Sequence, residues 1–178
     1  MQKIKSGQGF YSLWSVTAII LICLLAVSAT SAFAATTASV NATVTTQNIS
    51  VTVTDGSISY GTLDSNDTAS TIAADLNDLQ TATNNGNVTE DLNIRGQDSA
   101  DWTLSATSGT DQYVHRFCTA TCGTPPTNFT ALTTNYQSLS TGITSSSTQT
   151  FDLQINTPNP STVFTQQQVD VTVQAVIN

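Results

Sequence analysis

Apolar and polar residues alternate one by one along several short stretches of this chain, and this alternation constrains the fold more than any other feature. In the cleanest example, residues 169–175, Val169, Val171 and Val173 alternate with polar residues. Side chains of a β-strand point to opposite faces in turn, so a period of two predicts a half-buried strand. The same pattern occurs at 49–54, 58–60, 92–94, 102–106 and 151–155.

Turn residues separate these stretches, notably Asp55-Gly56 and the run Asn-Asn-Gly-Asn at 84–87. Residues 35–178 contain 46 Ser and Thr among 144 residues, and threonine favours strands. One-sided alternation favours antiparallel pairing. We therefore expect an all-β fold, an immunoglobulin-like antiparallel sandwich of seven to nine strands preceded by an N-terminal hydrophobic signal helix. Ile72, Leu76 and Leu79 have helical spacing, which predicts one short helix over 70–79.

The N-terminus has the layout of a secretory signal peptide. Lys3 and Lys5 precede an uncharged apolar run at 13–27, and Ala32-Phe33-Ala34 matches a small-x-small cleavage site. This pattern predicts a signal peptide at 1–34 and a single domain at 35–178, secreted to the cell-envelope surface.

Two other interpretations of the N-terminus stay open. The apolar run could be kept as a membrane anchor, because with its flanks it approaches the roughly 20 residues that span a bilayer. Gly9-Phe10 also has the position of a prepilin cleavage site, although Trp14 stands where pilins usually carry Glu. In that case the chain would be a pilin-type subunit that uses its apolar N-terminal helix.

Charge excludes several classes of function. The chain has 12 acidic and 4 basic residues, for a net charge of −8, and residues 35–178 keep only Arg95 and Arg116 as cations. Binding to nucleic acid needs basic side chains facing phosphates, so it is excluded. A domain without lysine also has no Schiff-base chemistry. Contact with a membrane would occur only through an uncleaved N-terminal segment.

Two cysteines follow the only histidine at close spacing. Cys118 and Cys122 predict a disulfide, because an exported chain meets an oxidising compartment. The alternative is a metal site formed by His115, Cys118 and Cys122, which supplies three ligands where structural zinc needs four.

The arrangement of acids and His115 predicts no catalytic function. The acid nearest to His115 in sequence is Asp111, and no G-x-S-x-G motif is present. Glu90 and Asp91 are adjacent on a predicted strand and therefore face opposite ways. We expect Asp98 and Asp101, in a turn, to accept hydrogen bonds from backbone N–H groups.

Calcium binding is the better use for the acidic residues of an exported sandwich. Asp64, Asn66 and Asp75 occupy positions of an EF-like loop, although Ala69 replaces the required glycine and no Glu closes the loop. Otherwise we expect no cofactor.

Five N-x-S/T sequons mark candidate glycosylation sites in exposed segments. Trp102 is the only tryptophan of residues 35–178 and shares an alternating face with Leu104, so we expect both to anchor the core, with an exposed sugar-stacking role for Trp102 as the alternative. The sequon asparagines are Asn41, Asn48, Asn66, Asn87 and Asn128.

The segment 95–109, with Trp102-Thr103-Leu104 after a polar turn, resembles the first signature of WxL-type cell-surface domains. The closing stretch 168–176 resembles their last strand, with Val171-Thr172-Val173 in place of a second Trp-x-Leu. The run Tyr60-Gly61-Thr62-Leu63 is similar to one in secreted fibre-forming sandwich proteins. The resemblance implies a non-catalytic, envelope-associated β-sandwich.

These observations predict a secreted structural or adhesive surface protein. Residues 36–46 place Ala38, Val40, Ala42 and Val44 at alternate positions. Such a strand can close its own sandwich or pair with the sheet edge of an identical subunit, which would build an extracellular filament by β-strand addition.

The alternative partner is a cell-wall glycan. In that interpretation the chain is a polysaccharide-binding module that uses loop aromatics, with Tyr113, Phe129 and Tyr136 as the candidates. The sequence names neither the host nor the glycan.

Overall fold

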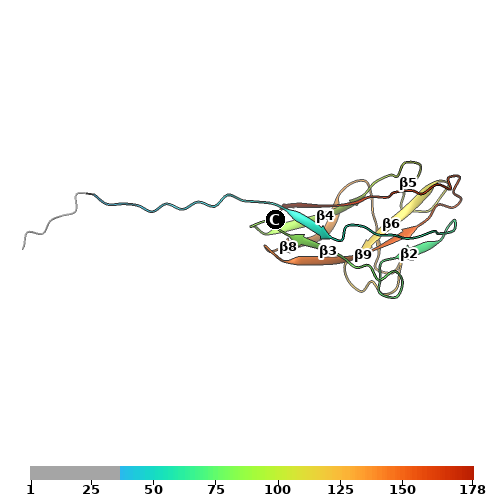
Figure 1. The fold of residues 1–178 in the computed structure, drawn as a ribbon, viewed down its shortest axis with the longest axis horizontal. Helices are drawn as coiled ribbons and strands as arrows, with labels where there is room; N and C mark the ends of the chain where they lie inside the picture. The colour runs from blue at the N-terminus through green and yellow to red at the C-terminus, as the bar shows by residue number, and fades with distance from the viewer. Residues whose placement is uncertain (1–36) are drawn as a thin grey trace, which may run out of the picture. The chain divides into compact units, whose positions relative to one another are not determined.

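Two β-sheets make up the part of the chain that the structure describes (Figure 1). The structure is a computed structural model and describes residues 37–178. The predicted signal peptide at 1–34 and its two alternatives lie outside the described residues. Residues 37–178 contain ten strands and no helix, which confirms the all-β prediction. The strands are β1 (Val51–Thr54), β2 (Thr68–Ser70), β3 (Gln80–Asn84), β4 (Glu90–Gly96), β5 (Thr103–Leu104), β6 (Gln112–Cys118), β7 (Thr130–Ala131), β8 (Gln137–Ile143), β9 (Thr148–Asn156) and β10 (Val171–Ile177).

The sheets are of unequal size. The first has seven strands in the order β1-β3-β9-β6-β5, with β2 also paired to β9 and β7 also paired to β6. The second has three strands in the order β10-β4-β8. All pairings are antiparallel except that of β5 with β6. Because β1 and β10 each end a sheet, one backbone edge of each lacks a strand partner among the described residues.

The main hydrophobic core lies between the two sheets. Leu92 and Ile94 of β4 are fully buried and pack with Leu139 of β8 against Ala82 and Phe151 of the larger sheet. Residues of β4 alternate between buried and half-buried along its whole length. This alternation is the pattern expected of a strand with one face toward a core and one toward solvent.

A second, smaller cluster lies beyond the reach of the three-stranded sheet. It consists of Ala69, Tyr113 and Ile155, all from the larger sheet. Half-buried apolar residues cover this second cluster. None of them lies in β4, β8 or β10, so the smaller sheet does not contribute to the cluster. The covering residues are Tyr60, Leu63, Trp102, Leu104 and Val169.

Three strands of ordinary length were not predicted, each for a physical reason. Strand β6 is buried on both faces over most of its length and so lacks alternation. Strand β3 has the polar residues Gln80 and Asn84 at buried positions, so its sequence shows no alternation of apolar and polar residues. Strand β8 is polar, buries only Leu139 and has an irregular register against β4. The other additions, β2 and β7, have three residues or fewer. Strand β5 lies within the predicted stretch 102–106 but is only two residues long.

Three expectations were wrong. Ser70 ends β2 and residues 71–79 form no helix. Asn77 has a left-handed backbone (φ 55°), and Asp75 Oδ2 accepts hydrogen bonds from the Ser70 N–H (2.6 Å) and Oγ (2.9 Å). Residues 58–60 are in no strand. Residues 37–46 also form no strand, so within the described residues this segment does not close its own sandwich. The turn expected at Asp55-Gly56 is present, with φ of 70° and 66°.

Gly96 occupies a crowded position at the end of β4, which gives a test of the packing. A Cβ added there would lie 2.7 Å from Leu104 Cδ2, so Gly96→Ala should lower the free energy of unfolding by about 1–3 kcal/mol. Gly123→Ala is the control, since no atom lies within 4 Å of its added Cβ, and its effect should stay below about 0.5 kcal/mol. Urea denaturation measures both. Equal effects would contradict this packing.

Candidate functional site

Tyr60 and His115 form a polar pair inside the second cluster. The Tyr60 hydroxyl lies 2.9 Å from His115 Nε2, and the two rings meet edge to face with centroids 5.8 Å apart. Burial raises the pKa of Tyr60, and the nearby carboxylates of Asp78 and Asp75 add to this effect. The tyrosine is therefore a neutral hydroxyl that ties the segment after β1 to the centre of β6.

His115 does not have the environment of a general base. It is 2% exposed, and burial lowers its pKa to about 4. Its Nδ1 has no hydrogen-bond partner within residues 37–178. Asp111 is engaged elsewhere: its carboxylate accepts hydrogen bonds from the Thr162 hydroxyl and from the Thr162 N–H, which lower its pKa. The structure therefore does not bring these two residues together as a catalytic pair.

The predicted Cys118–Cys122 disulfide is present, with a Cα–Cα distance of 5.7 Å. Since both sulfur atoms are used in this bond, the alternative metal site with His115 is wrong. Among residues 37–178 no group of three or more His, Cys, Asp or Glu could hold a metal ion.

Of the other candidate acids, Asp75 and Asp98 accept hydrogen bonds from backbone N–H groups, whereas Asp101 bonds to a side chain, so the expectation for Asp101 was wrong. Asp75 binds Ser70, as described above, and Asn66 sits in a turn with φ of 63°. Asp98 accepts a hydrogen bond from the Leu104 N–H (2.8 Å), whereas Asp101 accepts one from the Gln167 side-chain amide (3.0 Å). Asp64 is exposed.

Glu90 and Asp91 face opposite ways, as their places on β4 predict. Glu90 is fully buried, whereas Asp91 is half-buried. Asp91 accepts hydrogen bonds from the Asn178 side chain and the Gly142 N–H, and these lower its pKa.

The aromatic residues expected to bind glycan do not form one surface. Tyr113 is fully buried, so its assignment to an exposed loop was wrong. Tyr136 is 39% exposed and lies under the Arg95 guanidinium, 4.8 Å from its ring centroid. Phe129 is half-buried in the loop before β7. Trp102 is also half-buried and packs against Tyr113, with ring centroids 6.2 Å apart. Leu104 beside it is half-buried and contacts both clusters.

All five sequon asparagines are exposed, but two use their amide groups in local hydrogen bonds. Asn87 Nδ2 donates to the Thr46 carbonyl (2.8 Å), and Asn128 Nδ2 donates to Thr121 Oγ1 (2.8 Å). The sequon residues are Asn41, Asn48, Asn66, Asn87 and Asn128.

The entry of the chain into β1 is fixed by the turn between β3 and β4. Asn48 and Asn87 exchange two hydrogen bonds, one from the Asn48 N–H to Asn87 Oδ1 (2.8 Å) and one from the Asn87 N–H to the Asn48 carbonyl (3.1 Å). The buried Glu90 accepts the Ser50 N–H at 2.9 Å. We call residues 46–50, with the turn at 84–90, the entry clamp.

Gly86 makes this clamp possible. A Cβ there would lie 2.2 Å from Glu90 Oε1 and 2.4 Å from the Asn48 carbonyl, so no other residue fits. The Asn and Gly residues predicted this turn. They did not predict that the turn positions the segment before β1. The buried glutamate was also missed, although Leu92 and Ile94 mark the inner face of β4, because a charged side chain in phase with them is rarely buried.

The segment before the clamp has the composition of a strand without being one. Residues 37–44 form neither strand nor helix, and Val40 and Val44 are each 93% exposed. It belongs to a unit, Met1–Val44, separate from the compact unit Thr45–Asn178. Apolar side chains at alternate places are the pattern of a β-strand, which this segment does not form.

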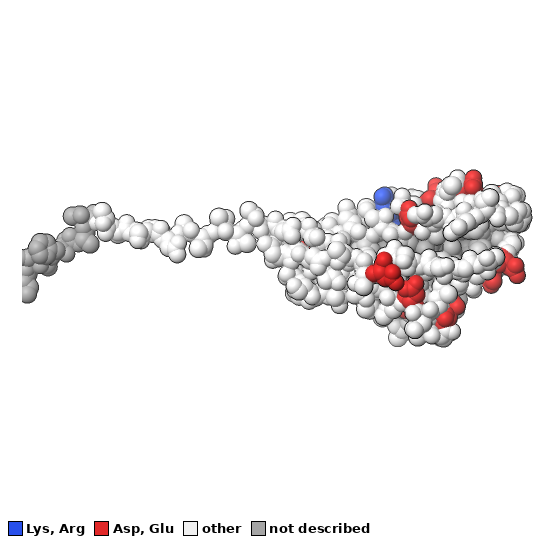
Figure 2. All heavy atoms as spheres, viewed as in Figure 1, with Lys and Arg blue, Asp and Glu red and all other residues white. Residues whose placement is uncertain are grey.

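Charge is sparse on part of the domain surface. On the face drawn in Figure 2, acidic side chains are scattered over one half of the domain, and the end that carries β1, β3 and β8 is almost free of charge. Charged residues are a common means of blocking edge-to-edge pairing of sheets. This end has few of them on the face shown.

No protein-family model, curated protein or solved structure matches this chain. Across residues 37–178 there is no helix long and apolar enough to span a bilayer.

His115 should make the stability of the protein depend on pH. Its pKa is lowered from 6.5 to about 4 in the folded state. Between these two values the unfolded chain binds a proton that the folded chain does not, so the free energy of unfolding falls as the pH falls from 6.5 to about 4. The loss attributable to His115 is up to about 3 kcal/mol.

Urea denaturation across this pH range, on the wild type and on His115→Gln, measures this contribution. Glutamine cannot titrate and can still bond to Tyr60, so the variant should show a flatter profile. Parallel profiles for the two proteins would contradict the assignment to His115.

Proposed function

We propose that this protein is a secreted, non-catalytic structural subunit of the cell envelope that assembles into extracellular filaments by β-strand addition. In this proposal the domain is an immunoglobulin-like sandwich, and residues 1–34 direct its export. The partner is an identical subunit. The segment 37–46 of one subunit, here called the donor segment, pairs as a strand with unpaired backbone at the surface of the next.

One observation carries the proposal: the donor segment has strand-like alternation, yet Val40 and Val44 are 93% exposed. Burial of a valine side chain is worth roughly 1.5–3 kcal/mol, so an isolated subunit leaves this free energy unused. Strand addition recovers it, because main-chain hydrogen bonds supply affinity and alternate side chains enter the partner surface.

The chemistry of the donor segment also supports self-association. It contains no charged residue, so pairing does not require desolvation of a charge. In a chain with a net charge of −8, like copies repel one another over most of their surface. An uncharged segment is the part of the subunit best suited to approach another copy.

Changing the two exposed valines tests the proposal without disturbing the subunit. Val40→Asp with Val44→Asp should weaken assembly on the order of 100-fold, because both carboxylates would be buried without partners in the assembled state. Sedimentation and electron microscopy of the purified protein measure the assembly. The free energy of unfolding of the monomer should not change, since both side chains are exposed.

The matched control is Ser39→Asp with Thr43→Asp, which adds the same charge at the same spacing on the opposite face. This control should assemble close to the wild-type level. If the two variants assemble equally well, or if removal of residues 35–46 leaves oligomers intact, the proposal is wrong.

A further inference from the structure

Two extended segments of the domain have backbones without strand partners. They are residues 57–63, which follow β1, and residues 164–170, which precede β10; together we call them the open strip. Among residues 37–178, neither segment takes part in any backbone–backbone hydrogen bond or strand pairing. Figure 1 shows both running lengthwise across the half of the domain that carries β2, β5, β6 and β9.

Both segments have strand-like side-chain alternation despite this lack of pairing. In the first, Ile58 and Tyr60 are half-buried and Ser59 is exposed; in the second, Val169 is half-buried between exposed neighbours. Tyr60 and Val169 pack against the same second cluster. The open strip therefore takes the place of a second sheet over this cluster, but without the hydrogen-bond ladder that a sheet has.

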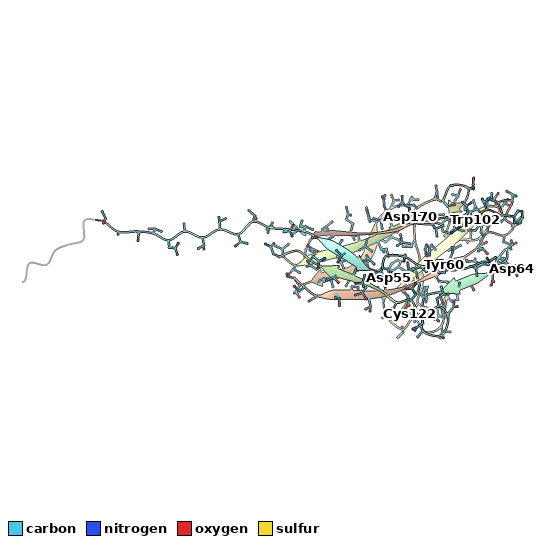
Figure 3. The ribbon with its side chains drawn as sticks, in the orientation of Figure 1. Asp55, Tyr60, Asp64, Trp102, Cys122 and Asp170 are labelled. Atoms are coloured by element: carbon cyan, nitrogen blue, oxygen red, sulfur yellow. A yellow bond between two sulfur atoms is a disulfide. The ribbon has the colours of Figure 1, made fainter. Side chains whose placement is uncertain are left out.

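Side chains attach the two segments to the domain. Tyr60 bonds to His115 (2.9 Å). Gln167 Oε1 accepts hydrogen bonds from Ser99 Oγ (2.9 Å) and the Asp101 N–H (3.1 Å), and Gln167 Nε2 donates to Asp101. Figure 3 labels Tyr60 on one segment and Asp170 at the end of the other. Because side chains do the anchoring, the backbone N–H and C=O groups of both segments stay open to another strand, apart from the Thr165 carbonyl, which accepts a hydrogen bond from Gln167 Nε2 (3.4 Å).

We propose that the open strip is the acceptor surface for the donor segment of a second copy of this chain, an inference that rests on the proposed function. The donor segment pairs through its backbone with the free backbone of the strip. Ala38, Val40, Ala42 and Val44 then cover the half-buried residues of the strip.

The donor segment and the open strip match in length and in chemistry. Each segment of the strip has seven residues, which span about 23 Å as a strand, and the ten-residue donor segment is long enough to cover it. The exposed side chains of residues 57–63 are uncharged, and Asp170 is the one charged residue of the strip. The strip offers apolar surface to the alanines and valines of the donor segment, because Tyr60 and Val169 are half-buried and Phe164 is 91% exposed.

The occupant is a second copy, not the chain's own donor segment. The entry clamp fixes residues 46–50, so the chain could reach its own strip only by reversing within 42–47. This stretch reads Ala-Thr-Val-Thr-Thr-Gln and holds no Gly, Pro, Asn or Asp. Tight turns depend on those residues, and β-branched residues oppose them.

Hydrogen exchange of backbone amides tests the acceptor surface. In the monomer, amides of residues 57–63 and 164–170 should exchange rapidly because they lack backbone partners. In the assembled protein they should exchange at least tenfold more slowly, while the loop at 121–124 serves as an unchanged reference. Assembly without slower exchange in either segment would overturn the inference.

Cross-linking between two different variants identifies the occupant. One copy carries Thr43→Cys and the other Ser59→Cys or Gln168→Cys, all with Cys23→Ser, and a short bis-maleimide joins them. The control acceptor is Thr134→Cys, exposed in the loop before β8. We expect at least tenfold more mixed dimer with the strip cysteines than with the control.

The outcomes separate this inference from the proposed function. Assembly that depends on Val40 and Val44, with no preference for the strip cysteines, leaves the filament proposal standing and overturns the acceptor site. A concentration-independent link within one chain carrying both Thr43→Cys and Ser59→Cys shows that the donor segment folds back, which also overturns it. Absence of any assembly overturns both.

Discussion

Backbone hydrogen bonding between strands, and the unequal size of the two sheets, govern the rest of this structure. A seven-stranded sheet presents more apolar surface than a three-stranded sheet can cover. The uncovered part, around Tyr113 and Ile155, is covered by extended chain that has no ladder of its own. The covering segments bury the apolar side chains of this cluster, but their own backbone groups have no backbone partners among residues 37–178. Strand addition by another chain can supply those partners.

Side-chain hydrogen bonds make this incomplete layer possible. Tyr60 with His115, and Gln167 with Asp101, keep the two covering segments in place. Burial keeps His115 neutral, so the pair is a tether and not a catalytic group. Side-chain hydrogen bonds also hold the chain in the entry clamp before β1. There the buried Glu90 and the Asn48–Asn87 pair set the position at which the chain enters the sheet.

Alternation in the sequence predicted β1, β4, β9 and β10, and it missed strands whose residue types do not alternate. In β9 only the residue types alternate, because Asp152 and Gln154 are buried along with their apolar neighbours. β6 is buried on both faces, and β8 is polar and buries only Leu139, so neither sequence shows a period of two. The apparent helix at 70–79 shows the opposite error: apolar spacing matched a helix, but Leu79 is 55% exposed and Asp75 caps a turn.

The sequence by itself determined the all-β fold and the Cys118–Cys122 bridge, because these follow from local periodicity and close cysteine spacing. Only the tertiary structure decided that Glu90, Tyr113 and His115 are internal, and that residues 57–63 and 164–170 cover one cluster without pairing. Those facts depend on which segments far apart in the chain share a layer. A local pattern of alternation is the same whether or not a strand finds a partner, so it carries no information about that choice.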